Sequence, residues 1–462
     1  MKNRTVILFS SLLLIPVIIF TFGIVKINKK SPVTLTLWHN YGGQMKDTMD
    51  EMIEEFNGTV GKKEGVFINV TSISGSSTLH EKLIMTANHD PGAPELPDIT
   101  TAYPKTALVL AEKGLLADLD ELFSKKEIEG YIPKFIEEGR LGGDHLYVLP
   151  TAKSTEVLFV NTTIFNRFAK ETGASLEDLR TFEGIKRTAK LYYDWTDRLT
   201  PDTKNDGKTF YVADSLYNYS LIGCAQLGTY LIKNNSFPRN DSTINYVWNS
   251  LFDPMVRGQY AIFDGYATDL AKTGDIVCST GSTAGVLFFS STVTYADNTT
   301  EPNELAILPY PVFENGNKVA IQRGAGMSII KSNSKKEKQA AIFLKWFTSP
   351  ENNLRFVAST GYLPVTENAF GDIMVKEIDS ITGPNIKNLL KVTREMQVTY
   401  DFLISPLFNG VDELEDKYND SLRSIASEAH NYYFHHMDLL TSDTEFQSLE
   451  ETSFATFSEF LQ

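Results

Sequence analysis

The chain alternates between strand-like and helix-like hydrophobic patterns after residue 32. Residues 33–37 alternate apolar and polar positions, which is the period of a half-buried strand. Apolar residues recur at helical spacing over residues 44–56, and a second helix is predicted over 80–88. Further strands are predicted at 66–70 and 98–100. This β-α-β-α-β order predicts an α/β protein with a parallel sheet and helices on both of its faces.

The later sequence continues with helices and one short strand. Helices are predicted near residues 176–193 and 218–233, and a strand at 276–278. The 462 residues predict two or three lobes rather than one, because a single hydrophobic core rarely grows to this size.

The stretch from residue 334 to 364 carries the most specific pattern. Ser334 and Glu337 form an S-x-x-E capping box, which predicts the start of a helix. An apolar face follows, and Pro350 comes after its end. A second short helix over residues 354–358 leads into the sequence Gly-Tyr-Leu-Pro at 361–364.

This block closely resembles part of the family 1 bacterial extracellular solute-binding proteins, the ligand-capturing subunits of ABC importers. Similar family features occur at residues 35–39, 97–99 and 323–326, and the resemblance extends over residues 33–367. It implies a two-lobed periplasmic-binding-protein-like fold with hinge crossovers and a ligand cleft between the lobes. Such a hinge lets two rigid lobes close over a ligand.

The resemblance also implies how the chain divides between the lobes. The expected N-lobe comprises residues 33–152 and 313–365, and the expected C-lobe comprises 153–312 and 366–462. Residues 1–32 precede both lobes as a signal anchor and tether.

The N-terminal segment predicts export. Lys2 and Arg4 precede twenty uncharged residues, 6–25, which are enough to span a bilayer. Neither a lipoprotein cysteine nor a clear A-x-A cleavage site follows. We therefore expect an N-terminal transmembrane anchor that holds the protein on the extracellular face of the cell membrane. A cleaved signal peptide, which would give a secreted protein, is the alternative.

Charge and cysteine content exclude several classes of protein. The net charge of −15, from 43 basic and 58 acidic side chains, argues against nucleic-acid binding and against docking on anionic lipid. Cys224 and Cys278 are the only cysteines and form no C-x-x-C, which argues against a zinc or iron–sulfur site. We favour two buried free thiols, although an exported location would permit a disulfide. No metal or cofactor is expected.

Four clusters are candidate ligand contacts. Residues 38–41 follow the first strand with aromatic rings that can stack on sugars, although Trp38 is equally suited to a core. Hydroxyl groups at 76–78 precede a predicted helix, where they can bind a ligand or cap the helix. Residues 279–285 combine four hydroxyl groups with two glycines and resemble the second-lobe ligand segment of the family. Arg323 can bind a carboxylate, a phosphate or vicinal hydroxyls, or instead form a salt bridge at the hinge.

These clusters and the lobe crossovers give the predicted ligand-binding residues. They are Trp38, His39, Tyr41, Thr78, Tyr103, Lys153, Ser154, Ser282, Thr283, Arg323, Gly324 and Tyr362.

The sequence predicts a binding protein rather than an enzyme, because it contains neither G-x-S-x-G nor H-E-x-x-H. We expect a monomeric substrate-binding component that captures a sugar or oligosaccharide by lobe closure and delivers it to the transmembrane permease subunits of an ABC importer. A binder of glycerol 3-phosphate or its diesters is the alternative ligand class. An anchored extracellular glycoside hydrolase and a sensor that presents solute to a receptor kinase are the alternatives of other kinds.

Overall fold

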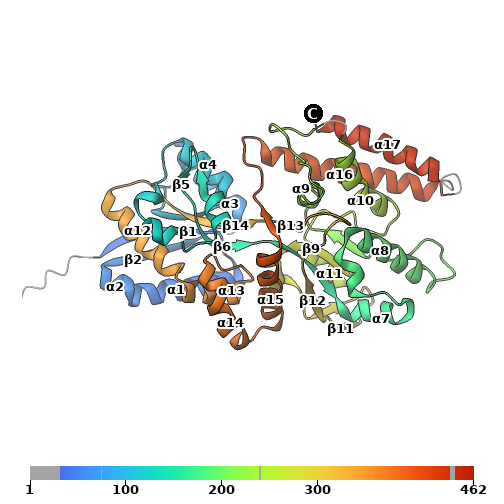
Figure 1. Ribbon diagram of the computed structural model, residues 1–462, viewed down its shortest axis with the longest axis horizontal. Helices are drawn as coiled ribbons and strands as arrows, with labels where there is room; N and C mark the ends of the chain where they lie inside the picture. Colours follow the sequence, from blue (N-terminus) through green and yellow to red (C-terminus); the bar gives the residue numbers. More distant parts are fainter. Residues whose placement is uncertain (1–31, 74, 239–240, 438–442, 462) are drawn as a thin grey trace, which may run out of the picture.

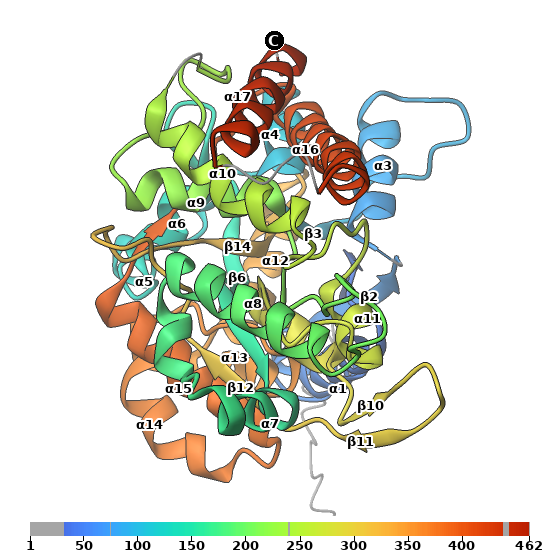
Figure 2. The ribbon, with the colours of Figure 1, turned by 90° about the vertical axis from the view of Figure 1, so that its right-hand side faces the viewer.

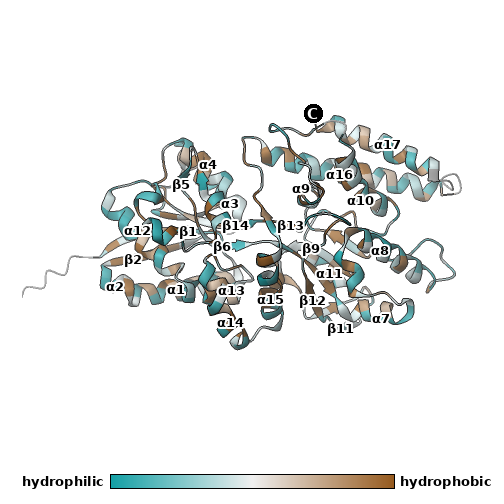
Figure 3. Cartoon of the chain, in the orientation of Figure 1, coloured by the Kyte–Doolittle hydropathy of each residue, from teal (hydrophilic) through white to brown (hydrophobic). Residues whose placement is uncertain are grey.

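Two β-sheets, each packed against its own helices, form the two lobes of the molecule (Figure 1). The computed structural model describes residues 32–73, 75–238, 241–437 and 443–461. The first lobe contains the N-terminal part of the described chain, and the second contains its C-terminal helices. The helices alternate hydrophobic and hydrophilic positions along their length (Figure 3), as expected of helices that cover a sheet with one face.

The first lobe is built on a five-stranded sheet in which three parallel strands lie beside two later ones. Its order is β2 (Val66–Ser72), β1 (Val33–His39), β3 (Ile99–Ala102), β14 (Arg323–Ile329) and β6 (Leu149–Ser154). The first three strands are parallel, as the sequence predicts, and β14 is antiparallel to both of its neighbours.

Amphipathic helices cover this sheet. The first of them, α1 (Gly43–Gly58), buries its methionines together with Ile53 and Phe56, as its spacing predicts. The other helices of this lobe are α2 (Val60–Glu64), α3 (Ser76–Ala87), α4 (Pro104–Glu112), α5 (Lys125–Ile128), α6 (Pro133–Gly139), α12 (Ser334–Phe347) and α13 (Pro350–Thr360). A small hairpin, β4 (Arg140–Leu141) and β5 (His145–Leu146), lies at its edge.

The second lobe is built on a four-stranded sheet. Its order is β12 (Leu305–Leu308), β7 (Glu156–Asn161), β9 (Cys278–Ser282) and β8 (Tyr211–Ala213). Its helices are α7 (Thr162–Thr172), α8 (Phe182–Asp197), α9 (Leu216–Gln226), α10 (Ser242–Val256), α11 (Ala267–Thr273), α16 (Val411–His435) and α17 (Asp443–Phe460). The hairpin of β10 (Thr292–Thr294) and β11 (Thr300–Pro302) projects from this lobe (Figure 2).

The segments that pass between the lobes lie side by side. The chain leaves β6 at Ser154 and enters β7 at Glu156, and the Thr155 hydroxyl donates a hydrogen bond to the Ile321 carbonyl (2.7 Å). Near them, β13 (Val319–Ile321) pairs in parallel with β15 (Asp401–Leu403). Gln322 therefore lies between two strands: β13, which pairs with β15, precedes it, and β14 of the first sheet follows it.

The chain stays in contact with the second lobe for longer than predicted before it returns to the first. The side chain of Gln226, at the end of α9, donates to the carbonyls of Pro311 (2.9 Å) and Val319 (3.0 Å). The lobe boundaries predicted from the sequence stay a prediction, but these contacts favour a return crossing near residue 322 rather than 313. Beyond it, α14 (Met374–Glu377) and α15 (Pro384–Thr399) follow, and α15 packs against both β12 and α13.

Several predicted boundaries are wrong for identifiable reasons. Asn333, not Ser334, is the N-cap of α12, because its side chain accepts from the Lys336 N–H (3.1 Å). Glu337 accepts instead from the Ser332 N–H (2.7 Å), two residues before the Ser334 N–H that the S-x-x-E pattern predicts. The second helix also begins earlier than predicted, with Pro350 as its first residue.

The predicted second-lobe elements differ in the same way. The predicted helix over 176–193 is two helices, a short 3₁₀ turn at Leu176–Arg180 and α8, because Thr181 caps the second with its side chain. The predicted helix over 218–233 ends at Gln226. The segment 279–285, predicted to follow the strand, divides between β9 and a 3₁₀ helix at Thr283–Phe288.

Both cysteines are free and buried, as the sequence predicts. The predicted anchor falls in residues 1–31, outside the described residues. Among the residues that are described, no helix is long and apolar enough to cross a membrane.

Candidate functional site

Two adjoining cavities lie between the lobes and share Ser76 and Arg323. We call the larger one, of about 720 Å³, the aromatic cavity. It is lined by residues 40–45, 75–76 and 362 of the first lobe, by Arg323, and by Phe159, Asp214, 266–269, 272, 279, 281–282, 284–285 and 287–289 of the second. We call the smaller one, of about 410 Å³, the acidic cavity. It is lined by 76–77, 80–81, 103–106, 138, 217–218, 321–324, 404–407, 411–412 and 415.

Aromatic rings from both lobes dominate the aromatic cavity. On the second lobe, Tyr266 is 74% exposed and Phe288 is 58% exposed, although both are large apolar side chains. On the first lobe, Tyr41 and Tyr362 are buried and lie edge to face, with ring centroids 6.1 Å apart. The first-lobe rings are held by packing, while the second-lobe rings are open to a ligand. Exposed aromatic faces of this kind suit the apolar faces of sugar rings.

Gly361 places Tyr362 at this cavity. It ends α13 in the left-handed conformation, with φ of +74°. A Cβ at this position would lie 2.7 Å from Val286 and 2.9 Å from the Thr283 carbonyl, both in the second lobe. The residue before Tyr362 therefore has to be glycine for the two lobes to approach this closely here.

Arg323 lies between the two cavities as the first residue of β14. Its guanidinium donates to the carboxylate of Glu156 (2.9 Å), which also accepts from the Asn218 amide (2.8 Å). Glu156 is only 1% exposed, and burial raises the pKa of its carboxyl group. Burial also raises the pKa of Asp214. The charge of Arg323 is thus already matched by carboxylates of the protein.

Gly324 brings the backbone of β14 against β6. With φ of +93°, it leaves no room for a side chain, since a Cβ would lie 2.5 Å from the Ala152 carbonyl. This close approach positions Arg323 opposite Ser154 in the sheet. Arg323 therefore sits at the crossover itself, where a change of lobe angle would alter its surroundings.

Most ionic groups around the acidic cavity are paired. Lys153 is buried and forms an ion pair with Glu138, whose carboxylate also accepts from the Gln322 amide (2.6 Å). Lys105 pairs with Asp412 across the lobes (2.8 Å). These pairs leave the cavity with carboxylates but no unpaired lysine or arginine among the described lining residues.

Six of the predicted site residues line these cavities. Tyr41, Ser282 and Tyr362 line the aromatic cavity, Tyr103 and Gly324 line the acidic one, and Arg323 lines both.

The other six predicted residues lie elsewhere. Trp38 packs against the cluster of Ile73, Leu79 and Leu83, which suits a core residue better than a ligand contact. His39 is buried, which lowers its pKa to about 4, and it accepts from the Tyr41 N–H (3.2 Å). The remaining four line neither cavity: Thr78 is exposed inside the first turn of α3, whereas Lys153, Ser154 and Thr283 are buried.

The sequence reasoning missed several lining residues. Tyr266 is the N-cap residue of α11 and Phe288 ends the 3₁₀ helix at Thr283–Phe288, and only their exposure in the folded protein distinguishes them from core aromatics. Asp214 follows the short strand β8, a strand-end position that could have marked it. Tyr217 and Glu415 come from helices whose relation to the cleft depends on how the lobes pack.

The comparisons with known proteins agree with this architecture. The family model for bacterial extracellular solute-binding proteins matches residues 51–378. No curated protein matches the chain by sequence.

Solved structures give the same fold. The cyclic alpha-maltosyl-1,6-maltose binding protein of Arthrobacter globiformis is 17% identical, with a TM-score of 0.67 over 93% of this chain and 99% of its own. UgpB of Mycobacterium tuberculosis, in complex with glycerophosphocholine, is 15% identical, with a TM-score of 0.66 over 93% and 98%. An ABC substrate-binding protein of Listeria monocytogenes, in complex with cycloalternan, is 15% identical, with a TM-score of 0.65 over 92% and 99%. At these identities the likeness establishes the two-lobed α/β fold.

Proposed function

Because the chain belongs to the bacterial extracellular solute-binding proteins, we propose that it captures a sugar or oligosaccharide between its lobes and delivers it to an ABC importer. Family members bind solutes outside the cytoplasm rather than transform them. Lobe closure would bury the ligand between Tyr41 and Tyr362 on one side and Tyr266 and Phe288 on the other.

The observation that carries this proposal is the pair of exposed rings in the aromatic cavity. Leaving Tyr266 and Phe288 in water forgoes the stabilisation that burial of such a side chain provides, about 1.5–3 kcal/mol for Phe. Hydroxyl groups and carboxylates, among them Ser279, Ser282 and Asp214, lie in the same cavity. This combination of open aromatic faces with nearby hydrogen-bonding groups suits a polyhydroxylated ring.

The charge distribution favours a neutral sugar over glycerol 3-phosphate or its diesters. A phosphate needs an available cation, and Arg323 was the candidate for that role. Its guanidinium is instead bonded to Glu156, and Lys272 of the aromatic cavity pairs with Asp269 (3.0 Å). An anion placed beside Arg323 would also approach Asp214 and Glu156. We therefore place a sugar without an anionic group first and the phosphorylated ligand second.

A binding screen on the full chain tests the proposal. The protein would be held in a polyoxyethylene detergent, because sugar-headed detergents could occupy the site. Thermal unfolding would be followed with maltose, maltotriose, glycerol 3-phosphate and glycerophosphocholine. A ligand at a hundred times its dissociation constant adds about 2.7 kcal/mol, which shifts the midpoint by several degrees. We expect a shift with the neutral sugars, and a shift only with the phosphorylated compounds would contradict the preferred ligand class.

Two tyrosine variants test whether the ligand binds in the aromatic cavity. Tyr266→Ala should weaken sugar binding about tenfold or more, since stacking on an exposed ring contributes on the order of 1–2 kcal/mol, and should leave the unliganded midpoint within about 1 °C. Tyr230→Ala is the matched control, because Tyr230 is 67% exposed but lines neither cavity. Equal affinities for both variants would remove the aromatic cavity from the site.

A further inference from the structure

The acidic cavity contains buried polar atoms that have no partner in the protein. Tyr217 is 2% exposed and Gln322 is 1% exposed, and both line this cavity. The Tyr217 hydroxyl and the Gln322 side-chain oxygen make no hydrogen bond in the described part of the chain. Buried polar atoms are usually paired, because an unpaired one costs about 1–3 kcal/mol. The Gln322 oxygen can only accept and the Tyr217 hydroxyl can accept as well as donate, so a donor group in the cavity could bond to both.

The charges around the cavity point to the kind of donor. Three cations near it are each paired with one carboxylate: Arg323 with Glu156, Lys105 with Asp412, and Lys153 with Glu138. After these pairings the carboxylates of Glu81 and Glu415 remain among the lining residues, and neither has a hydrogen bond or an ion pair among the residues that the structure describes. Glu81 is exposed, whereas Glu415 is partly buried.

Aromatic rings accompany this carboxylate. Tyr103 and Tyr217 line the same cavity from the first and the second lobe. Burial raises the pKa of Tyr217, and the charge of Glu415 raises it further. A carboxylate next to tyrosine rings attracts a cation through both its charge and the negative faces of the rings. Burial raises the pKa of the Glu415 carboxyl group although Arg323 and Lys105 act to lower it. A cationic group in the cavity would therefore stabilise its ionised form, whereas a neutral hydroxyl would satisfy only the unpaired oxygens.

We propose that the acidic cavity is a subsite for a positively charged amino or ammonium group carried by the ligand whose sugar ring occupies the aromatic cavity. This inference rests on the proposed function, since it assigns the second half of the same cleft. The ligand class becomes an amino sugar or another sugar with a cationic substituent. Glu415 provides the countercharge, and Tyr217 and Gln322 accept hydrogen bonds from the group.

A pair of trisaccharides with the same backbone tests the charge. One is the glucosamine trimer, which carries ammonium groups, and the other is its fully N-acetylated, neutral counterpart. Calorimetric titration of the full chain in polyoxyethylene detergent should show that the cationic trimer binds at least about tenfold more tightly, since a hydrogen bond to a charged group contributes about 1.5–3 kcal/mol. The preference should fall when salt is raised from 50 to 500 mM, because charge attraction is screened.

Variants on helices α16 and α9 test the roles of Glu415 and Tyr217. Glu415→Gln should reduce the ratio of the two affinities to near one, while Glu413→Gln, an exposed acid in the same first turns of α16, should preserve it. Tyr217→Phe should weaken the cationic trimer about threefold to tenfold without lowering the unliganded midpoint, because its hydroxyl has no partner to lose. This second variant keeps the test valid if Glu415→Gln fails to fold.

The outcomes separate this inference from the function on which it rests. Equal affinities of the two trimers, a ratio that Glu415→Gln does not change, or binding of neutral maltotriose but of neither trimer would overturn the ammonium subsite and leave sugar binding standing. Absence of binding by every carbohydrate would overturn both proposals.

Discussion

Arg323 and Glu156 join the two sheets at the point where the chain crosses between them. Arg323 begins β14 of the first lobe, Glu156 begins β7 of the second, and their side chains lie 2.9 Å apart. Glu156 is buried, whereas the Arg323 side chain is 34% exposed. The two partners are therefore unequal: loss of the arginine leaves a buried carboxylate, and loss of the acid leaves a cation that water can still reach.

This asymmetry predicts unequal effects of substitution. Arg323→Gln should lower the free energy of unfolding by about 2–3 kcal/mol, and Glu156→Gln by about 1 kcal/mol. The double variant should be more stable than Arg323→Gln alone, because the stranded charge is gone. Urea unfolding of the three variants measures this. Equal losses in the two single variants, or simple additivity in the double one, would contradict the interpretation.

The pH dependence of Arg323→Gln follows from the same carboxylate. Burial raises the pKa of folded Glu156 above its unfolded value of about 4.3, so the folded state holds this proton more readily. The contribution of Glu156 to the free energy of unfolding therefore increases as the pH falls toward the unfolded pKa. The loss of free energy of unfolding that Arg323→Gln causes should be smaller at pH 5 than at pH 7. The corresponding loss in the double variant should not change between these pH values.

Single residues were predictable where local chemistry dictates their position. The hydroxyl-rich segment at 279–285 and the glycine at 324 are such cases, because small residues at a crossover admit few alternatives. Trp38 shows the limit, since a half-buried aromatic at a strand end suits a core and a cleft equally. Tyr266 and Glu415 could not be found, because only the arrangement of the lobes brings them to a cavity.

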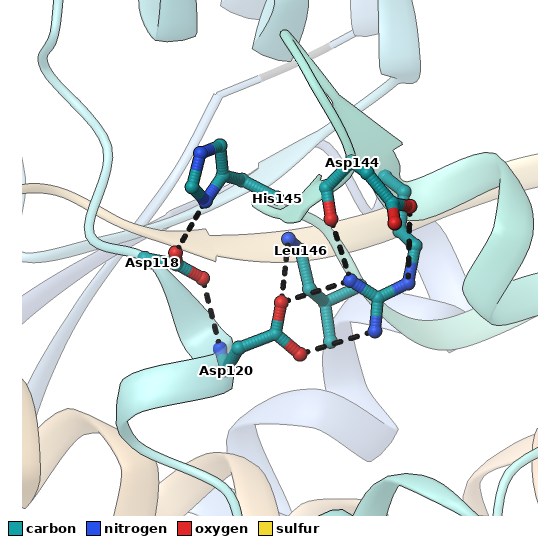
Figure 4. Close-up of polar contacts among 6 residues, drawn as sticks. Asp118, Asp120, Asp144, His145 and Leu146 are labelled. Carbon is teal, nitrogen blue, oxygen red and sulfur yellow. Dashed lines mark hydrogen bonds and ion pairs between the residues drawn. The ribbon is translucent and has the colours of Figure 1, made fainter.

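At the scale of elements, the β4–β5 hairpin shows how polar contacts fix a short structure. Arg140 donates to both carboxylate oxygens of Asp120 (2.8 and 3.1 Å) and to the Asp144 carbonyl (2.7 Å), and Asp120 also accepts from the Leu146 N–H (3.2 Å) (Figure 4). His145 contacts Asp118 at 2.7 Å beside them. Because each strand has only two residues, these contacts hold the hairpin more than its own ladder does.

Arg140→Gln should therefore destabilise the protein by about 1 kcal/mol at pH 6, in keeping with a partly exposed bidentate pair. The hydrogen bonds from Arg140 lower the pKa of Asp120, so this stabilisation is present above the unfolded pKa of about 3.9 and is lost as the pH falls through the folded value. The gap between wild type and variant, measured by urea unfolding, should narrow between pH 6 and pH 3. Lys113→Gln serves as an exposed control nearby, and a gap that widens with acid would refute this account.

Element order was predictable, and element boundaries were less so. The periodicity of residues 33–100 gave β1, β2 and their helices, because one face of each is buried, whereas β3 was found as a short segment and is buried throughout. Helix ends depended on which of several adjacent polar residues caps them, as Asn333 and Ser334 show. Periodicity did not predict the strands β14 and β6, since both are buried on both faces and do not alternate apolar with polar residues.

At the scale of the whole molecule, the lobes are joined by neighbouring backbone segments near Thr155, Gln322 and Leu403. The Gln322 N–H donates to the Leu403 carbonyl (2.8 Å), so these segments can turn together as a hinge. The resemblance to a family implied the two-lobed fold, which residue patterns alone did not establish. The angle between the lobes depends on side chains from distant parts of the chain, and no local pattern encodes it.

Lobe closure is measurable because the native cysteines are inaccessible. Cys224 is fully buried and Cys278 is 2% exposed, and burial raises the pKa of the Cys224 thiol to about 12, so neither should react with a thiol label. Spin labels at Glu51→Cys in α1 and Lys190→Cys in α8 would then report the distance between the lobes. Saturation with a sugar that binds should shift this distance distribution to shorter values, because closure brings the two aromatic walls together.

Two controls decide whether such a shift reports closure on the ligand. Labels at Glu51→Cys and Lys126→Cys, both in the first lobe, should show no change, because a lobe moves as a rigid body. At a sugar concentration about ten times the parent's dissociation constant, Tyr266→Ala in the interlobe-labelled protein should show no more than about half of the shift, and it should approach the full shift only at about tenfold or more higher concentration. An interlobe distance that is the same with and without bound sugar would show that the lobes do not close on it, and capture would then depend on the preformed cavities alone.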